Sequence, residues 1–157
     1  MQHSIAWDEP LVAAMGTFQL SRRRFLPDPD ALSTQQIEQG SRFAPKFDAS
    51  GLLASVVIDS RTKEVLVIAF MNADALQKTR ETGKVHFWSR SRSSLWMKGE
   101  TSGNVLSVDE IRVDCDQDAL VIYATPAGPT CHTGETSCFY RKLDLSAPDG
   151  SALSRLA

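Results

Sequence analysis

The sequence predicts an α+β fold: a small, strand-rich single domain with one clear helix and two long functional loops. Three observations lead to this prediction. Apolar runs rich in β-branched residues recur from residue 51 onward, one stretch carries a start and a stop signal for a helix, and two polar stretches containing glycine are too long for tight turns. A length of 157 residues suits one domain of this kind.

The regular elements follow in chain order. The run LLASVVI, the polar turn DSRTKE and the run VLVIAF predict a β-hairpin over residues 52–70. Asn72 is a favourable N-cap and Gly83 a favourable stop for a helix over residues 73–82. Four further apolar runs predict strands over residues 84–89, 105–116, 119–125 and 138–143. We expect the last of these strands to close the core.

The two ends of the chain depart from this pattern. Residues 1–44 contain the basic stretch SRRRFLPDPD, which two prolines interrupt, and ALSTQQIEQGSRF, which can form a short helix ending near Gly40. We expect these residues to be a loosely attached N-terminal extension or arm, and the alternative is that they pack on the core. The domain is then expected over residues 45–143, followed by a C-terminal tail over residues 144–157.

Composition and charge exclude several classes of protein. The formal net charge is -2, so the chain lacks the overall basic excess of proteins that bind nucleic acid or anionic membranes. Its start lacks the pattern of a signal peptide, and no apolar run reaches the ~18 residues of a membrane span. We therefore expect a cytoplasmic protein with no nucleic-acid partner and no membrane partner.

All three cysteines lie in one stretch, DCDQDALVIYATPAGPTCHTGETSCF. An odd number cannot pair completely within one chain, and clustered thiols in a reducing compartment favour a metal site or catalysis. Cys115, Cys131 and Cys138 therefore predict three thiolate ligands to zinc, with water in the fourth position. We expect His132 beside the site, because adjacent residues rarely point at one metal. A closed site with His132 as fourth ligand, and three inert buried cysteines, are the alternatives.

The motif DCDQD alternates acids with other residues. If the predicted strand continues through it, Asp114, Asp116 and Asp118 share one face while Cys115 points to the other. Carboxylate oxygens suit Mg²⁺, which often bridges to substrate phosphates. The alternative is a solvated acidic strand end.

The loop predicted over residues 90–104 is locally basic. Arg90, Arg92 and Lys98 suit phosphate recognition, and the two arginines would share a face if the preceding strand continued. Gly99 can let the backbone approach an anion closely, and the hydroxyls of Thr101 and Ser102 can donate hydrogen bonds to it. Trp96 can stack on a base. The alternatives are a solvated loop and a tryptophan that belongs to the core.

The motifs HFWSRSRSSLWMKGETSGN, DCDQD and CHTGETSCF, in this order and spacing, resemble the phosphoribosyl-AMP cyclohydrolase family of histidine biosynthesis. The resemblance spans residues 45–142. It implies a metal-dependent hydrolase that opens the adenine ring of 1-(5-phosphoribosyl)-AMP at N1–C6 to give the phosphoribosyl-formimino-AICAR phosphate product, the third step of that pathway.

The resemblance also implies an intertwined homodimer with one Zn²⁺ and one Mg²⁺ per subunit. Each zinc would take Cys115 from one subunit and Cys131 with Cys138 from the other. The three aspartates of DCDQD would hold magnesium. The substrate would be a phosphorylated purine nucleotide, held by the residues named for the basic loop.

This chemistry suits the residues. Bound zinc lowers the pKa of water for attack on purine C6, and His132 is the candidate general base. Two other functions fit the same motifs. A purine deaminase would make the same attack but release ammonia. A non-enzymatic zinc module would instead bind RNA through the basic loop, with a closed zinc site and strong salt dependence.

Overall fold

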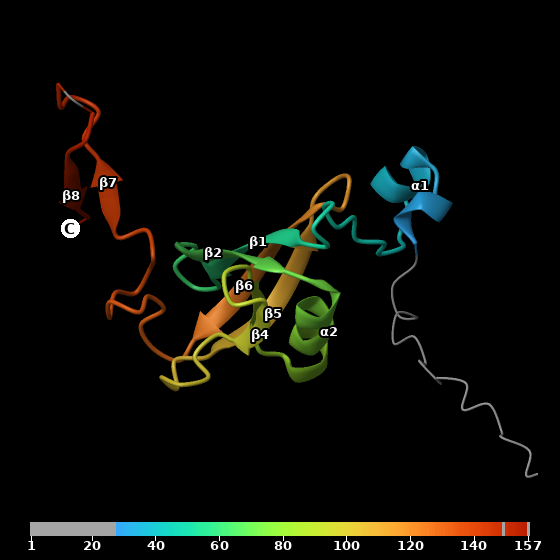
Figure 1. The fold of residues 1–157 in the computed structure, drawn as a ribbon, viewed down its shortest axis with the longest axis horizontal. Helices are drawn as coiled ribbons and strands as arrows, with labels where there is room; N and C mark the ends of the chain where they lie inside the picture. Colours follow the sequence, from blue (N-terminus) through green and yellow to red (C-terminus); the bar gives the residue numbers. More distant parts are fainter. Residues whose placement is uncertain (1–27, 149, 157) are drawn as a thin grey trace, which may run out of the picture.

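The computed structural model describes residues 28–148 and 150–156, and its body is a four-stranded sheet in the order β2-β1-β6-β5 (Figure 1). The small, strand-rich α+β fold predicted from the sequence is confirmed. The strands are β1, Leu53–Asp59; β2, Val65–Met71; β5, Leu106–Val113; and β6, Ala119–Pro126.

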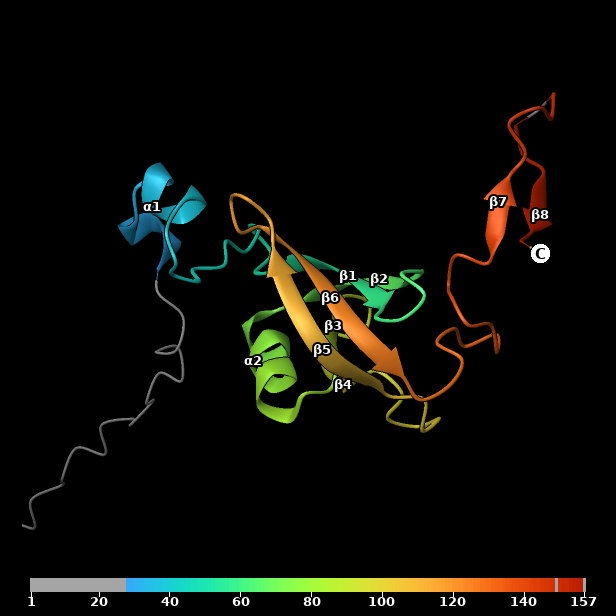
Figure 2. The ribbon, with the colours of Figure 1, turned by 180° about the vertical axis from the view of Figure 1, so that it is seen from behind.

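Two antiparallel hairpins make up this sheet. β1 pairs with β2 and β5 pairs with β6, and the parallel pairing of β1 with β6 joins the two hairpins. The connection from β2 to β5 carries the helix α2, Ala73–Thr82, and a third hairpin, made of β3, His86–Ser89, and β4, Ser94–Met97. Figure 2 shows α2 and this hairpin on one side of the sheet.

The core lies between the sheet and these covering elements. Along β1 the inward positions Leu53, Ser55 and Val57 are buried, while the positions between them are partly exposed. This alternation follows from the two-residue period of a strand. The inward positions pack against α2 and β3 through a set of fully buried side chains that includes Leu66, Met71, Leu76, Val85, Phe87, Leu106, Leu120 and Ile122.

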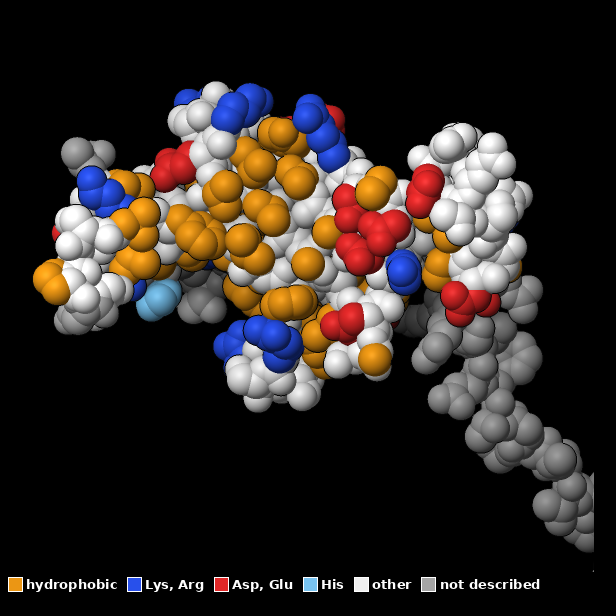
Figure 3. Space-filling model, turned by 90° about the horizontal axis from the view of Figure 1, so that it is seen from above, with side chains coloured by type: hydrophobic (Ala, Val, Ile, Leu, Met, Phe, Trp, Pro, Cys, Tyr) orange, Lys and Arg blue, Asp and Glu red, His pale blue; other side chains and the backbone are white. Residues whose placement is uncertain are grey.

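The other face of the sheet is also apolar. It carries Val56 and Ile68, which are cross-strand partners, together with Phe70, Val121 and Tyr123 from the same alternating positions. Ile68 is 50% exposed. Figure 3 looks onto a broad apolar surface here, with an acidic cluster at its edge. Among the described residues no helix or strand covers this surface, which we call the open face.

The predicted hairpin and helix are confirmed. Asn72 Oδ1 accepts the backbone N–H of Ala75 at 2.9 Å, and Gly83 ends α2 with a φ of 64°. A left-handed residue at this position lets the chain turn away from the last helical turn. The short helix expected near the N-terminus is also present as α1, Thr34–Glu38, after a single 3-10 turn, η1, Pro29–Ala31.

Residues 90–104 are not one loop, because they contain β4. Leu95, Trp96 and Met97 give this stretch enough apolar surface to pair with β3, and the Trp96 ring packs 5.3 Å from that of Phe87. The polar residues on either side obscured this short strand in the sequence.

The prediction that residues 138–143 close the core was wrong. Within them, β7, Arg141–Leu143, pairs with β8, Leu153–Arg155, in a separate two-stranded sheet whose residues are exposed (Figure 1). Arg155 also pairs with Glu135 in the preceding loop. The apolar residues of this stretch alternate too poorly to form a buried strand.

The boundaries expected at residues 44/45 and 143/144 stay predictions, and residues 1–27 of the expected arm lie outside the described part of the chain. None of the helices among the described residues has the length and apolar character needed to cross a membrane.

Replacing the cap residue should destabilise the fold. Asn72→Ala leaves an N–H of the first turn of α2 without its partner, so we expect the free energy of unfolding to fall by about 1 kcal/mol. Urea denaturation followed by circular dichroism measures the change. Gln77→Ala, at a partly exposed position of the same helix, is the control and should change stability by no more than about 0.5 kcal/mol. Equal stability of Asn72→Ala and the unmodified protein would contradict the cap.

Candidate functional site

The predicted metal ligands form two clusters, one beside each outer strand of the four-stranded sheet. The cysteine pair, Cys131 and Cys138, lies beside the outer strand β2, because the N–H of Cys138 donates to the carbonyl of Leu66 at 2.8 Å. The acid loop, residues 114–118, connects β5 to β6 and therefore begins at the other outer strand.

Hydrogen bonds hold the loop that carries the cysteine pair. Ser137 Oγ donates to the carbonyl of Val65 at 2.6 Å, which ties the loop to β2. Around Cys131, which is buried, Thr133 Oγ1 donates to the sulfur at 3.1 Å and His132 Nδ1 lies 3.8 Å from it. His132 itself is exposed, so it sits beside the pair and open to solvent.

The two thiols have opposite electrostatic environments. The hydroxyl of Thr133, followed by its backbone N–H, lowers the pKa of Cys131 by stabilising the thiolate. Although Cys138 reaches the surface, partial burial, followed by the charge of the neighbouring Cys131, raises its pKa to about 11, and Lys98 acts in the opposite direction. Cys131 is thus the thiol that ionises more readily, and a nearby cation would favour ionisation of Cys138.

The acid loop is a turn and not a continuation of β5. The strand ends at Val113, Asp114 N–H donates to the Ala119 carbonyl at 3.3 Å, and Asp114 Oδ1 accepts the Ala119 N–H at 3.0 Å. The predicted strand alternation was therefore wrong here. Cys115 does not point away from the acids, since its sulfur lies 4.0 Å from Asp116 Oδ1.

The turn nevertheless brings the three aspartates together. One carboxylate oxygen from each of Asp114, Asp116 and Asp118 lies within 4.8 Å of the others. The charge of Asp116, followed by a hydrogen bond to Asp114, raises the pKa of Asp118. Crowded carboxylate oxygens of this kind form a donor set suited to a hard divalent cation.

A single copy of the chain cannot bring all three cysteines to one metal. Neighbouring strands lie about 4.8 Å apart, so β2 and β5 are separated by roughly 14 Å, and Cys138 lies outside β2. Two thiolates on one zinc lie no more than about 4.6 Å apart. Cys115 is therefore too far from the cysteine pair within one chain.

The two predicted arginines lie in the turn between β3 and β4. The Arg90 guanidinium is 4.1 Å from the centre of the Phe70 ring, and that of Arg92 is 5.9 Å from the Trp96 ring. Because β3 ends at Ser89, the two arginines do not share a strand face as expected. Both side chains are exposed.

The other predicted substrate residues lie beyond the opposite end of β4. Lys98 follows that strand and affects Cys138, as described above. Gly99 has a φ of 85°, and a Cβ there would meet the Asn104 backbone at 2.3 Å, so glycine allows this close packing. Thr101 and Ser102 are exposed at the following turn. Trp96 is partly buried against the core.

Comparisons with known proteins point to one family. A phosphoribosyl-AMP cyclohydrolase family model matches residues 67–140. A phosphoribosyl-AMP cyclohydrolase of Erythrobacter litoralis is 59% identical over 116 residues, which are 74% of this chain and 93% of that protein. The chain belongs to the phosphoribosyl-AMP cyclohydrolase family. Proteins of the same name from Sphingopyxis alaskensis and Brucella suis are 58% identical over 110 residues (70% of this chain, 87% of theirs) and 57% identical over 109 residues (68% and 78%).

Membership in the phosphoribosyl-AMP cyclohydrolase family confirms the resemblance drawn from the three motifs. The expectation of an enzyme, a hydrolase of histidine biosynthesis, is confirmed with it. The metal ions, the shared zinc site and the individual residue roles stay predictions.

The sequence reasoning missed two residues of this cyclohydrolase site. Thr133 donates to a cysteine sulfur, and the only signal was its place two residues after Cys131 in CHTGETSC. Gln117 lies inside the acid loop, and nothing in its residue type indicated that it would be buried.

Removing the Thr133 hydroxyl should change the titration of Cys131. Because the hydrogen bond favours the thiolate, Thr133→Val should raise the pKa of Cys131 and shift its alkylation to higher pH. Iodoacetamide rates measured against pH on zinc-free protein, with peptide mass spectrometry to separate the thiols, measure this shift. Thr136→Val, at an exposed hydroxyl in the same loop, is the matched control. An unchanged Cys131 profile in Thr133→Val would show that the hydroxyl does not act on the thiol.

Proposed function

We propose that this chain opens the adenine ring of 1-(5-phosphoribosyl)-AMP with a zinc centre shared between two copies and a magnesium ion at the acid loop. Membership in the phosphoribosyl-AMP cyclohydrolase family supports the reaction. The separation of Cys115 from the cysteine pair across the sheet is the observation that carries the shared centre.

The cysteine pair fits zinc. Its soft sulfur donors suit this metal, Thr133 favours one thiolate, and a cation would offset the unfavourable charge of the second. Cys115 is exposed, so it is accessible to the cysteine pair of another copy. When bound, zinc supplies a water molecule of lowered pKa and leaves the protein to orient the substrate and move the protons.

The acid loop fits magnesium. Its three carboxylates converge, and the raised pKa of Asp118 reflects repulsion that a divalent cation would relieve. Asp114, Asp116 and Asp118 would hold the ion, and a substrate phosphate would complete its oxygen ligands. The dimer would thus hold one zinc and one magnesium per subunit, and each subunit would contribute ligands to both zinc sites.

The open face supports the intertwined homodimer. In a sheet made of antiparallel hairpins, a face exposed to water normally carries polar side chains. Here that face presents Val56, Ile68 and Tyr123 instead. A second copy would remove this surface from water and bring its own Cys115 within reach of the cysteine pair.

The hydrolysis moves both protons of the attacking water. The water oxygen bonds to C6, the N1–C6 bond breaks, and the two protons pass to N1 and to the exocyclic nitrogen, so that C6 becomes the carbonyl carbon of a carboxamide. His132 is proposed as the base, because it is exposed and lies beside Cys131. Arg90, Arg92 and Lys98 are proposed to hold the two phosphates.

Four further residues are proposed to contact the substrate. Trp96 is partly exposed and can contact the base, while the exposed turn containing Gly99, Thr101 and Ser102 can contact phosphate. We also propose that the enzyme works in the cytoplasm, since reduced thiols are needed at Cys115, Cys131 and Cys138.

Incubation of the purified protein with phosphoribosyl-AMP should give the ring-opened product, followed by absorbance. Treatment with a chelator should remove magnesium before zinc, and loss of either ion should lower the rate. His132→Asn should reduce kcat by roughly 10²–10⁴-fold with zinc content unchanged. Release of ammonia would instead identify a deaminase, and loss of zinc in the variant would make His132 a ligand.

Mixing two inactive variants tests the shared zinc centre. Cys115→Ser and Cys138→Ser should each be inactive alone. When they are unfolded and refolded together, each heterodimer has one site with both lesions and one site with none. With random pairing, activity should return to about a quarter of the unmodified level. If each zinc site were built within one chain, the mixture would stay inactive.

A further inference from the structure

Gln117 is the buried residue of the acid loop. Its side chain is 6% exposed, whereas Asp116 is partly exposed and Asp118 is exposed. Its backbone φ is 63°, in the left-handed region that residues other than glycine seldom adopt. A buried polar side chain on a strained backbone requires strong compensating contacts.

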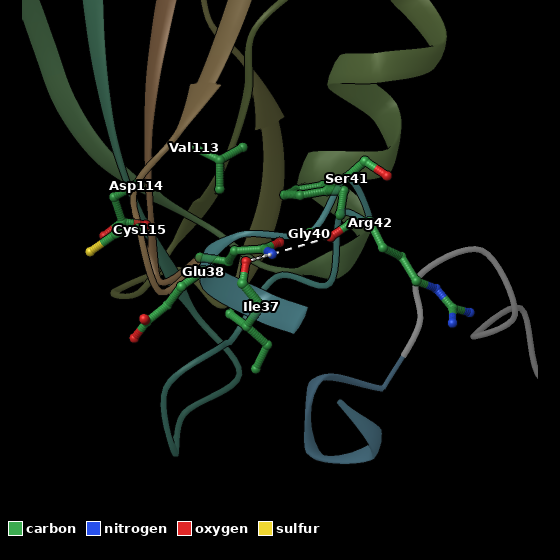
Figure 4. Close-up of a pocket in the computed structure, with 10 residues that line it drawn as sticks. Ile37, Glu38, Gly40, Ser41, Arg42, Val113, Asp114 and Cys115 are labelled. Atoms are coloured by element: carbon green, nitrogen blue, oxygen red, sulfur yellow. Dashed lines mark hydrogen bonds between the residues drawn. The ribbon is translucent and has the colours of Figure 1, made fainter. Parts of the chain in front are cut away.

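Four of those contacts reach the segment that precedes the core, and a fifth lies within the loop, where the Gln117 N–H donates to the Asp114 carbonyl at 3.4 Å. Gln117 Oε1 accepts the N–H of Ala44 at 2.7 Å, and Nε2 donates to the carbonyls of Ile37 and Arg42, both at 3.1 Å. Figure 4 draws the two donated bonds as dashed lines. The carbonyl of Gln117 also accepts the N–H of Lys46 at 2.8 Å. We call residues 37–46 the strap.

The four bonds link the shape of the strap to that of the loop. The carboxamide uses its oxygen and both of its N–H groups, so it is satisfied only while the strap backbone stays in place. If Gln117 left its left-handed conformation, the side-chain bonds would break together, and the buried N–H of Ala44 would lose its partner. The strap and the loop also border one hollow of about 360 Å³, lined in part by Asp114 and Cys115 (Figure 4).

We propose that Gln117 is a positioning residue, which fastens the strap across the acid loop and thereby holds the three aspartates in the arrangement that binds a divalent cation. The proposal rests on the magnesium site of the proposed function. It assigns to residues 37–46, of which residues 37–44 were expected to be part of a loosely attached arm, a share in the site.

The competing explanation is that hydrogen bonds within the acid loop are enough to keep the three aspartates in place. Asp114 makes two hydrogen bonds with the backbone of Ala119, and these involve neither the strap nor the Gln117 carboxamide. If they suffice, removal of the carboxamide would free the strap without changing cation binding. The two explanations therefore differ in one measurable quantity, the Mg²⁺ affinity of a variant that lacks this side chain.

Three substitutions distinguish the effect of the Gln117 carboxamide from the effect of its left-handed backbone conformation. Gln117→Ala removes the carboxamide and keeps the steric cost of the left-handed conformation. Gln117→Gly removes the carboxamide but allows that conformation freely. Gln117→Glu keeps an acceptor for the Ala44 N–H but cannot donate to the two carbonyls. Asn72→Ala, which removes the cap of α2 and none of the Gln117 hydrogen bonds, controls for general loss of stability.

Two readouts need no substrate. Trypsin cleavage after Arg42 reports release of the strap, because Gln117 holds the carbonyl of the scissile bond. Titration of the zinc-loaded protein with Mg²⁺ in a calorimeter reports the loop. We expect all three variants to be cleaved faster at Arg42 and to bind Mg²⁺ about tenfold or more weakly, as for other residues that support metal ligands. Asn72→Ala should keep the unmodified affinity.

Kinetics give a third readout. At temperatures well below unfolding, the ring-opening rate of Gln117→Ala should approach the unmodified rate when Mg²⁺ is raised, and that of Asn72→Ala should not depend on added Mg²⁺ in this way. If the fastened strap favours Mg²⁺ binding, bound Mg²⁺ must equally favour the fastened strap. Mg²⁺ should therefore slow cleavage at Arg42 in the unmodified protein.

The outcomes separate the two proposals. Unchanged Mg²⁺ affinity in Gln117→Ala, or in Gln117→Gly alone, overturns the positioning role, since the loop then holds itself or needs only its backbone conformation. Unchanged cleavage at Arg42 in the Gln117 variants overturns the proposal that this side chain fastens the strap to the acid loop. An unmodified protein that binds no Mg²⁺ overturns the magnesium site of the proposed function and this role with it, whereas normal binding without ring opening overturns only the proposed reaction.

Discussion

The parallel pairing of β1 with β6 is the contact on which the rest of the structure depends. Each hairpin alone would be marginal in water, and this pairing makes one sheet with a common buried face. It also makes β2 and β5 the outer strands, and thereby places the cysteine pair and the acid loop on opposite sides of the body. In the proposed dimer, a second copy would bring these two edges of the sheet together.

The separation of the two clusters also suits their electrostatics. The cysteine pair binds a cation only after deprotonation, and three nearby carboxylates would raise the pKa of its thiols further. At the far edge the carboxylates are exposed, where water screens their mutual repulsion until an ion binds. The cysteine pair is thus kept apart from the carboxylates, whereas Cys115 lies among them.

The sequence was informative where local signals decide structure, and misleading where tertiary contacts decide it. Asn72 and Gly83 marked the ends of α2, because capping depends on residues close in sequence. The alternation in DCDQD is equally compatible with a strand and a turn, and the burial of Gln117 against a segment some 75 residues earlier left no local pattern. The cysteines and aspartates were found as candidate ligands from residue type, whereas their division between two edges required the strand order.

In the proposed dimer, the open face would link assembly to metal binding. Exposed apolar surface in one copy favours association, and a zinc ion with ligands from two copies would stabilise the associated form by mass action. Association would in turn raise zinc affinity, since Cys115 would be supplied at high local concentration once the faces meet. In this arrangement a dilute single copy would hold zinc by the cysteine pair alone. Folding, dimer formation and metal loading are then three aspects of one equilibrium, and each site is completed only when the sheet faces are covered.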